Sequence, residues 1–511
     1  MRIAVAGKRF ARSTRRRADR LSAVGAGYDG SAACALRQAH HMLSFMPPLD
    51  APHTDVSTIP TLAADVRRTF ETGRTRPIAW RRLQLQRVLA LVTERESEIL
   101  DALAADFGKP RFESWATEAG FVAADVKHTL SQLAKWMRPE RAKTNLANLP
   151  GKSRVLREPL GSVLIIAPWN YPIQLLLSPL TAALAAGNCA VLKPSELTPA
   201  CAALMAKLIP EYLDREAVRV VEGGIDETTA MLRERWDHIF FTGGGAVGRI
   251  VMEAAAKHLT PVTLELGGKS PCIVDADVDL VTAARRIVWA KFVNAGQTCV
   301  APDYLLVHRS VQSALLAEMK KVTADFYGDD PQKSPDFARI VSTRHHARLV
   351  ALLGDGEAFM GGQHDAATRY LAPTILTNVK LDAKLMTDEI FGPILPVVPV
   401  DSVAEAISFV RAREKPLALY IYSRDHSAVD DVLARTSSGG VCVNDCMMHL
   451  AVSDLPFGGV GPSGMGAYHG KAGFDCFSHR KAVLDKSTLV DPALRYPPYT
   501  ADKEKWARRL L

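Results

Sequence analysis

Residues 163–196 read VLIIAPWNYPIQLLLSPLTAALAAGNCAVLKPSE, and this stretch decides the fold. Val163 to Ile166 is a short apolar run typical of a buried strand, and Leu175 to Ala186 is long enough for a helix. A second short apolar run follows at Ala190 to Leu192. A strand, a helix and a strand in this order predict a βαβ unit with two parallel strands.

The same alternation continues after this unit. Helices and strands are predicted in turn at Ala200–Leu208, Val218–Val221, Glu227–Glu234, His238–Phe241, Val247–Lys257 and Val262–Leu266. Beyond Cys299 a strand, two helices and a strand are predicted at Leu305–Val307, Val311–Phe326, Ala404–Ala412 and Leu419–Tyr422. Such alternation predicts two α/β units with parallel sheets covered by helices on both faces. The Gly- and Pro-rich run Pro456–Gly466 is interpreted as a loop that crosses between the units.

One cysteine lies in a setting suited to nucleophilic chemistry. The run FVNAGQTC places Cys299 at the end of a small polar turn, after the helix-like apolar segment Ile287–Val293. Such a turn can leave a thiol partly exposed among backbone N–H groups, conditions that favour a thiolate and an oxyanion site beside it. Upstream, LELGGK places Glu265 between apolar neighbours, a setting that can tune a carboxylate into a general base.

These two segments resemble the catalytic motifs of the aldehyde dehydrogenase superfamily. Four more segments resemble family motifs in the family's order, namely PWN, KPSE, FTGGGAVG and EIFGP, which begin at Pro168, Lys193, Phe241 and Glu389. All six motifs fall at the ends of predicted strands, where parallel sheets bind ligands. Further segments resemble the class-3-like branch, which acts on aromatic and medium-chain aliphatic aldehydes: Lys257–Val262, Ala301–Tyr304, Glu414–Tyr420, Leu455–Gly461 and Tyr468–His479.

The resemblance implies an aldehyde dehydrogenase-like α/β fold, with two Rossmann-like domains, parallel-rich sheets and a small β oligomerisation arm. Residues 1–55 are then a basic, disordered N-terminal extension, and residues 56–264 are an NAD(P)-binding domain interrupted by an arm segment at 142–157. Residues 265–445 are the catalytic domain, and residues 446–511 are a C-terminal loop that packs on the arm. Because the branch is usually dimeric, we expect a homodimer.

The resemblance also assigns the site residues. Cys299 is the nucleophile, Glu265 activates water, and the Asn170 side chain binds the oxyanion together with the Cys299 backbone N–H. Glu389 is a reserve candidate for the base. The cofactor-binding residues are Pro168, Trp169, Lys193, Glu196, Gly243, Gly248, Glu389 and Phe391. No metal is required, because the thiol, the oxyanion donors and the cofactor supply the chemistry.

The cofactor is expected to be NAD first and NADP second. Lys193 and Glu196 would bracket the adenosine ribose, and a carboxylate at Glu196 should repel a 2′-phosphate. Relatives with the same KPSE segment nevertheless accept NADP. Residues 243–248 also satisfy the GxGxxG fingerprint, with Glu265 seventeen residues further on. We reject a ribose-binding role for Glu265, because it lies in the segment that resembles the family's base motif.

Each of these residues has a structural alternative. Cys299 could be an inert buried thiol, Glu265 a salt-bridge partner, Asn170 a turn residue, Lys193 a surface lysine, Glu389 a helix cap and Phe391 a core residue. Trp169, Trp289 and Tyr304 are candidates for an aromatic substrate tunnel, with core packing as the alternative. The run Cys446–Leu450, which includes Met448, is expected to shape the tunnel mouth, where flexible methionines suit varied apolar substrates.

The net charge of +8 comes almost entirely from the first 20 residues, which carry eight basic side chains and one acidic side chain. The charge therefore belongs to an N-terminal arm, and we expect no nucleic-acid-binding domain. Three interpretations of this arm stay open. It is a disordered tail upstream of a true start at Met42 or Met46, an organellar transit peptide, or an arm that binds nucleic acid or an anionic surface.

The composition is that of a globular enzyme, with 48% hydrophobic and 23% charged residues. The eight cysteines are scattered, so we expect free thiols in the cytoplasm and no zinc site. The sequence contains no stretch of eighteen uninterrupted apolar residues, so we expect no membrane span. Two rival functions are a thiol acyltransferase or esterase that uses Cys299, and a non-enzymatic, crystallin-like protein.

Overall fold

The computed structural model describes residues 53–510, and within them the quoted stretch forms the predicted βαβ unit. Strand β3 (Ser162–Ile166), helix α7 (Gln174–Ala186) and strand β4 (Cys189–Lys193) follow one another, and the two strands pair in parallel. Every residue of both strands is buried, as expected for a parallel strand with helices on both faces. Gly187 ends α7 with a φ of 91°, a left-handed conformation that glycine adopts without strain.

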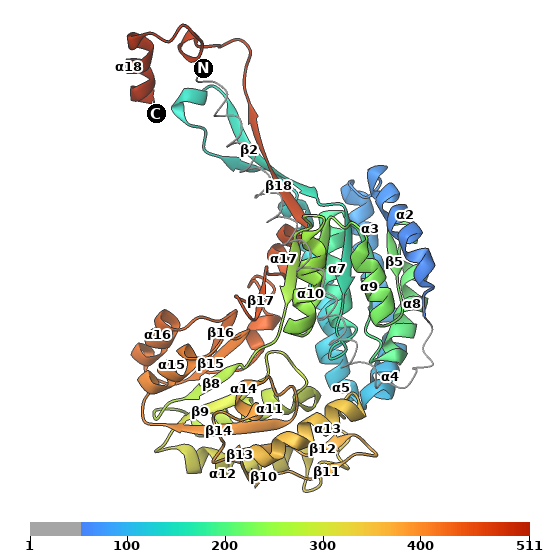
Figure 1. Ribbon diagram of the computed structural model, residues 1–511, viewed down its shortest axis with the longest axis vertical. Helices are drawn as coiled ribbons and strands as arrows, with labels where there is room; N and C mark the ends of the chain where they lie inside the picture. Colours follow the sequence, from blue (N-terminus) through green and yellow to red (C-terminus); the bar gives the residue numbers. More distant parts are fainter. Residues whose placement is uncertain (1–52, 511) are drawn as a thin grey trace, which may run out of the picture. The chain divides into compact units, whose positions relative to one another are not determined.

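The βαβ unit is the centre of a six-stranded sheet with the order β17-β7-β6-β3-β4-β5. Its other strands are β5 (Val218–Val220), β6 (His238–Thr242), β7 (Val262–Glu265) and β17 (Gly464–Met465). The connecting helices are α8 (Pro199–Tyr212), α9 (Ile225–Arg233) and α10 (Gly245–Ala256). Right-handed crossovers place α7 and α8 on one face and α9 and α10 on the other (Figure 1). The alternation predicted up to Leu266 is confirmed.

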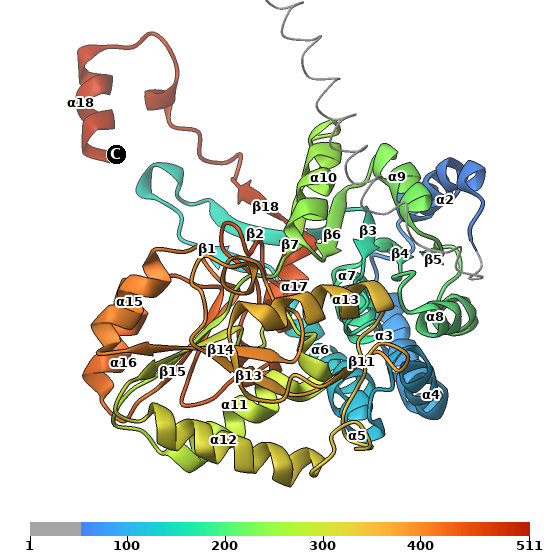
Figure 2. The same cartoon turned by 60° about the horizontal axis from the view of Figure 1, so that its bottom comes forward.

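A second, seven-stranded sheet has the order β10-β13-β14-β9-β8-β15-β16. Its strands are β8 (Pro271–Val274), β9 (Tyr304–His308), β10 (Glu357–Met360), β13 (Thr374–Thr377), β14 (Ile394–Val400), β15 (Ala418–Tyr422) and β16 (Gly440–Val443). Helices α11 (Leu280–Phe292) and α12 (Gln312–Tyr327) cover one face, and α15 (Val403–Arg411) and α16 (His426–Arg435) cover the other (Figure 2). The predicted second α/β unit is thus present.

The interpretation of Pro456–Gly466 as a loop is wrong for two residues. Gly464 and Met465 form β17, which pairs antiparallel with Glu265 and Leu264 at the edge of the first sheet. A strand of two residues is too short to give an alternating pattern. Gly464 has a φ of 140°, and a Cβ there would lie 2.2 Å from the Leu264 carbonyl oxygen, so the pairing requires glycine. The C-terminal segment is therefore fixed beside Glu265.

A third sheet has three antiparallel strands: β1 (Glu140–Ala142), β2 (Lys152–Pro159) and β18 (Ser478–Asp485). β18 pairs with β2 over its full length, and the two strands lie side by side in Figure 1. The segment predicted to be an oligomerisation arm, 142–157, spans the last residue of β1, the connection from β1 to β2 and most of β2. The predicted domain boundaries stay predictions, although the chain passes from the first sheet to the second between Glu265 and Pro271.

Further helices and short strands surround the sheets. They are η1 (Val56–Thr58), α2 (Ile59–Glu71), α3 (Ile78–Glu94), α4 (Glu96–Phe107), α5 (Arg111–Ser114), η2 (Trp115–Ala119), α6 (Gly120–Trp136), η3 (Leu146–Asn148), η4 (Val293–Gly296), α13 (Thr343–Leu352), η5 (Leu353–Asp355), β11 (His364–Asp365), β12 (Tyr370–Leu371), α14 (Lys384–Thr387), η6 (Met448–Ala451), α17 (Gly470–Cys476), η7 (Ala493–Arg495) and α18 (Ala501–Leu510). None of the helices within residues 53–510 is long and apolar enough to cross a membrane. The predicted N-terminal extension lies outside the described residues, except for its last three.

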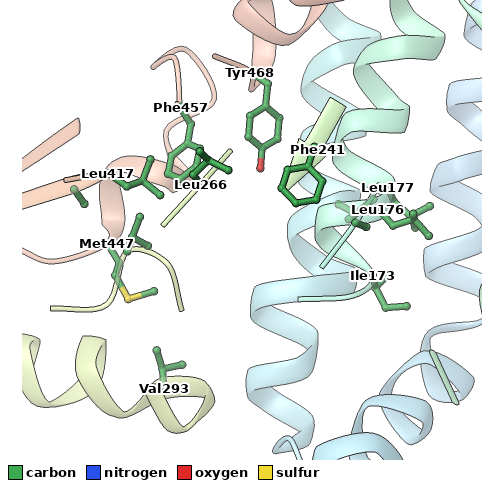
Figure 3. Packing of buried hydrophobic residues seen from close by; sticks show 14 of the residues in the cluster. Ile173, Leu176, Leu177, Phe241, Leu266, Val293, Leu417, Met447, Phe457 and Tyr468 are labelled. Carbon is green, nitrogen blue, oxygen red and sulfur yellow. The ribbon is translucent and has the colours of Figure 1, made fainter. Parts of the chain in front are cut away.

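A continuous cluster of buried hydrophobic side chains extends from one sheet to the other. Figure 3 shows part of it, with Phe241 on the side of the first sheet and Leu417 and Met447 on the side of the second. Phe457 and Tyr468 come from the C-terminal segment and lie between the two groups. The active-site candidates lie along this junction.

Candidate active site

A cavity of about 450 Å³ opens between elements of both sheets and brings most of the predicted site residues together. Eight of the eleven line it, namely Pro168, Trp169, Asn170, Gly243, Glu265, Cys299, Glu389 and Phe391. The other three, Lys193, Glu196 and Gly248, do not line this cavity. The walls are mainly apolar, so a bound apolar molecule would meet polar groups only near the predicted catalytic residues.

The loop that carries Cys299 is held in an unusual backbone conformation. Within η4, the chain has positive φ angles at Asn294 (53°), Ala295 (49°) and Gly296 (73°). Such conformations are sparsely populated by non-glycine residues and persist only where surrounding contacts fix them. The Gln297 side chain supplies such contacts, because its Nε2 donates to the carbonyls of Asn294 and Arg339, both at 3.0 Å. The loop therefore presents Cys299 to the cavity in a single defined position.

The thiol of Cys299 is not activated in this state, contrary to the expectation of a favoured thiolate. Burial, followed by the nearby carboxyl groups of Glu389 and Glu265, raises its pKa to about 12. The backbone N–H groups of Cys299 and Val300 act in the opposite direction and lower the pKa. These N–H groups are also placed to donate hydrogen bonds to an oxyanion formed at Cys299. The turn supplies the donors that the sequence predicted, but the surroundings outweigh them.

We expect the alkylation rate of Cys299 to follow this raised pKa. Below its pKa, the thiolate fraction rises tenfold per pH unit, so the rate constant for iodoacetamide should rise by about tenfold per unit from pH 7 to pH 10. The measurement is peptide mapping of the Cys299 adduct over time, because six other described cysteines are also free thiols. A plateau below pH 8 would show a thiolate that is already formed and would contradict the raised pKa.

Asn170 lies in the turn between β3 and α7 and is tied directly to the cysteine loop. Its side-chain Nδ2 donates to the Gln297 carbonyl at 3.0 Å, and its own carbonyl accepts from Asn294 Nδ2 at 2.8 Å. An amide nitrogen carries two hydrogens, so one stays available for a substrate oxygen. Since Asn170 is buried and lines the same cavity as Cys299, it can serve as an oxyanion donor.

Glu265 is a buried carboxyl group at the carboxyl end of β7. Neither of its oxygens has a hydrogen-bond partner among the described residues. Burial raises its pKa well above the ordinary value of 4.5, because the surrounding apolar groups disfavour the charged carboxylate. Glu265 forms no ion pair with any described residue, which excludes the alternative of a structural salt bridge within that part of the chain. An unpartnered carboxyl in a cavity is typical of a group that exchanges protons with a ligand or water.

Glu389 and Phe391 face the cavity from the segment before β14. Burial raises the pKa of Glu389 to about 8, while a hydrogen bond from the Gly268 backbone lowers it. A Cβ on Gly267 would lie 2.0 Å from Glu389 Oε2, so glycine makes room for this carboxyl. Glu389 is not a helix cap, since α14 ends at Thr387. The ring of Phe391 meets that of Trp169 edge-on, with 5.2 Å between the centroids.

The ends of β4 and β6 provide features that fit a dinucleotide. Lys193 closes β4, and its Nζ lies 2.6 Å from Glu196 Oε2. Helix α10 begins at Gly245, directly after β6, and a helix N-terminus attracts phosphate. Gly248 lets this helix approach the sheet, because a Cβ there would lie 2.8 Å from Leu266 Cδ2. With the unpartnered Glu265 nearby, these residues fit a nicotinamide dinucleotide.

Several cavity residues were not predicted. They are Tyr171, Thr242, His345, Arg348, Leu417, Phe457, Tyr468 and His469, among others. Most lie in separate segments that only the fold brings together, although Tyr171 directly follows Asn170. Trp169, Trp289, Met447, Met448 and Leu450 line the cavity as expected. The tunnel assignment of Tyr304 is wrong, because this residue is 1% exposed and packs in the core of the second sheet.

Comparisons with known proteins agree with this geometry. The chain matches the aldehyde dehydrogenase family over residues 49–483. It is 50% identical over 448 residues to aldehyde dehydrogenase family 3 member A2 of Mus musculus, covering 87% of this chain and 93% of that protein. It is 46% identical over 448 residues to the dimeric NADP-preferring aldehyde dehydrogenase of Canis lupus familiaris, covering 87% and 99%.

A solved structure supports the same assignment. The substrate-bound state of Staphylococcus aureus AldH matches this structure with a TM-score of 0.86 at 45% identity, covering 88% of this chain and 99% of that chain. The fold class inferred from the alternation is confirmed by this match. Neither rival function receives support from the comparisons. The chain belongs to the aldehyde dehydrogenase family, in its class-3-like branch, and is an NAD(P)-dependent enzyme.

Proposed function

We propose that this aldehyde dehydrogenase oxidises aromatic or medium-chain aliphatic aldehydes to carboxylic acids, with Cys299 as the nucleophile. One observation carries the proposal: Cys299, Asn170 and Glu265 meet in a single cavity whose other walls are mainly apolar. The apolar walls favour a substrate with an apolar body, and the three polar residues fit the chemistry of one reacting carbonyl.

The first step forms a bond between the Cys299 sulfur and the aldehyde carbon. The thiol gives up its proton to solvent water, and the carbonyl oxygen takes up negative charge as a thiohemiacetal anion. Asn170 Nδ2 and the Cys299 backbone N–H hold this oxyanion, and one such donor is typically worth about 3 kcal/mol. Loss of a hydride from the same carbon then leaves a thioester on Cys299. The bound cofactor supplies the hydride acceptor.

The second step hydrolyses the thioester. The Glu265 carboxylate takes a proton from a water molecule while the water oxygen attacks the acyl carbon. The carbon–sulfur bond then breaks, the acid leaves, and the proton passes from Glu265 to the sulfur to restore the thiol. The raised pKa of Glu265 suits a base that must hold a proton during the step. Glu389, with a pKa of about 8, faces the same cavity and is the reserve candidate.

Lys193 and Glu196 would hold the adenosine ribose, the N-terminus of α10 the diphosphate, and Glu389 and Phe391 the nicotinamide half. Pro168, Trp169 and Gly243 would line the path between them. NAD is the preferred cofactor in this proposal, because the Glu196 carboxylate would face a 2′-phosphate. Lys193 Nζ is neutralised by Glu196 at 2.6 Å, so it offers that phosphate little attraction.

Glu196→Gln should therefore shift cofactor preference toward NADP. Removing the carboxylate frees the charge of Lys193, and we expect the ratio of kcat/KM for NADP to that for NAD to rise by about tenfold, which is about 1.4 kcal/mol. Steady-state kinetics with both cofactors at fixed aldehyde measures the ratio. Glu94→Gln, on the exposed surface of α3, is the matched control. An unchanged ratio would remove Glu196 from the ribose site.

We further propose a cytoplasmic homodimer in which the three-stranded sheet contacts the partner. The arm region presents exposed large apolar side chains at Leu146, Leu149, Leu484 and Leu489, with exposed fractions of 69%, 50%, 48% and 94%. Such a group of exposed side chains is typical of an interaction surface. The name of the Canis lupus familiaris relative describes that protein as dimeric. Light scattering on wild type and on Leu146→Glu would test this proposal.

The experiment for the proposed function is an NADH-production assay with benzaldehyde, coniferyl aldehyde, hexanal and decanal. Turnover that disappears in Cys299→Ala supports the proposal, and the ranking of the four aldehydes identifies the preferred class. No turnover with any of them, from protein whose Cys299 still reacts with iodoacetamide, would refute this substrate class. Activity that survives in Cys299→Ala would refute the role of the nucleophile.

A further inference from the structure

The helix that begins at Arg111 is interrupted by a π-helical turn close to the active site. The turn, η2, lies between α5 and α6, and the Gly120 N–H closes it by donating to the Trp115 carbonyl. Single π-turns inside helices are frequently found at functional sites. Glu113 lies just before this turn, in α5, and Glu118 lies within it. Their side-chain carboxyl groups contact two different parts of the active site.

Glu118 holds the turn that carries Asn170. Its Oε2 accepts hydrogen bonds from the backbone N–H groups of Ile173 (3.0 Å) and Gln174 (2.9 Å), at the start of α7. Its Oε1 accepts from Lys109 Nζ at 2.9 Å, and both side chains of this ion pair are fully buried. A buried ion pair is a weak source of stability. The ion pair is therefore better explained by its geometric effect: it fixes Glu118, and Glu118 orients the start of α7.

Glu113 holds the loop that carries Cys299. Its Oε1 accepts a hydrogen bond of 2.8 Å from the backbone N–H of Asn294. Asn294 is the first residue of the loop with a positive φ, so this carboxylate fixes the point at which the strained conformation begins. The same Asn294 donates from Nδ2 to the carbonyls of Asn170 and Gln297. Any shift of Asn294 would thus move both the oxyanion donor and the nucleophile.

Lys109 and Tyr171 connect the two halves. The Lys109 ammonium lies 4.0 Å from the centroid of the Tyr171 ring, a cation–π geometry. The Tyr171 hydroxyl is 2.7 Å from Thr298 Oγ1, directly before Cys299. One buried chain of contacts therefore leads from Glu118 through Lys109 and Tyr171 to the cysteine loop.

We propose that Lys109, Glu113 and Glu118 are positioning residues, which set the distance and angle between Asn170 and Cys299 from outside the cavity. None of the three lines the cavity, so they act through Asn294, Tyr171 and the start of α7. This inference rests on the proposed roles of Asn170 and Cys299. It assigns to these three side chains a function in the attack step, whereas Ala116 and Thr117 of η2 line the cavity directly.

The test compares Glu113→Ala, Glu113→Asp and Glu113→Gln in the full-length enzyme. Alanine removes the acceptor for the Asn294 N–H, aspartate withdraws it by one methylene and keeps the charge, and glutamine retains an acceptor oxygen. We expect kcat with hexanal, counted per alkylatable Cys299, to fall by about tenfold to a hundredfold for alanine and aspartate, because small displacements of reacting groups cost that much. The KM values and the affinity for NADH should stay within about threefold, and glutamine should restore kcat to within about threefold of wild type.

Asp101→Ala is the matched control, because Asp101 is an exposed carboxylate of α4 that pairs with Arg111 of α5, the helix that carries Glu113. The proposal is overturned if Glu113→Ala and Glu113→Asp keep wild-type kcat per reactive Cys299, or if they lose only folded protein. It is also overturned if glutamine does not restore turnover, or if KM alone changes. Cys299→Ala run in parallel separates the two levels: activity in that variant would refute the nucleophile itself, whereas normal kcat in the Glu113 variants would refute only the positioning role.

Discussion

Cys299→Ala is expected to lower aldehyde oxidation by about 10⁴-fold or more, because no other group in the cavity can form the covalent thiohemiacetal. Tyr171, Thr298 and Tyr468 also line the cavity, but their hydroxyl groups are weak nucleophiles. The measurement is NADH formation with hexanal and with benzaldehyde. NADH binding, followed by tryptophan fluorescence, should be unchanged, since the thiol occupies little of the cofactor path.

The matched control for this prediction is Cys201→Ala. Cys201 is a buried free thiol in α8 that does not line the cavity, so its loss should leave turnover within about threefold. Wild-type turnover in Cys299→Ala would contradict the account. Equal losses in the two variants would indicate general damage rather than the removal of a nucleophile.

Glu265→Gln is expected to separate the two halves of the reaction. Acylation needs Cys299 and Asn170 but no base at Glu265, so a burst of NADH equal to the number of sites should survive. Steady-state turnover should fall by about 10²- to 10³-fold, the usual contribution of a general base. Stopped-flow measurement of NADH gives both quantities. The carboxyl has no hydrogen-bond partner among the described side and main chains, so the isosteric amide should disturb the fold little.

Glu389→Gln distinguishes the reserve base from Glu265. If Glu389 serves mainly the cofactor, its amide variant should raise the KM for NAD and leave the ratio of burst rate to steady-state rate near the wild-type value. A steady-state loss in Glu389→Gln with no loss in Glu265→Gln would reverse the two assignments. A lost burst in Glu265→Gln would show that this carboxyl acts before the thioester forms.

The arrangement of strands could be predicted from the sequence because buried parallel strands and their helices leave strong local patterns. Val163–Ile166 and Ala190–Leu192 lie within β3 and β4. Asn170 and Glu265 could be placed at one edge of the first sheet because parallel strands collect their carboxyl ends there. Cys299 lies between α11 and β9, so only the resemblance to the family motifs placed it in the same site. The two-residue strand β17 gave no pattern, since its pairing depends on the close approach of Gly464 to Leu264.

Properties that depend on surroundings could not be predicted locally. The Phe292–Cys299 turn indicated an activated thiol, but Glu389 and Glu265 come from distant segments and help to raise its pKa. Tyr304 looked like a tunnel residue, but its side chain packs against the ring of Phe409, with 5.7 Å between the centroids. The contacts of Glu113 and Glu118 join segments far apart in the sequence, so no local sequence motif could predict them.

The central claim is that the aldehyde carbon becomes covalently bound to Cys299, and mass spectrometry tests this most directly. Glu265→Gln would be mixed with NAD and decanal, quenched in acid during the burst, digested and mapped. The account predicts a decanoyl group on the peptide that contains Cys299, in an amount equal to the NADH released. A burst of NADH with no acyl group on Cys299, or with the group on another residue, would contradict it.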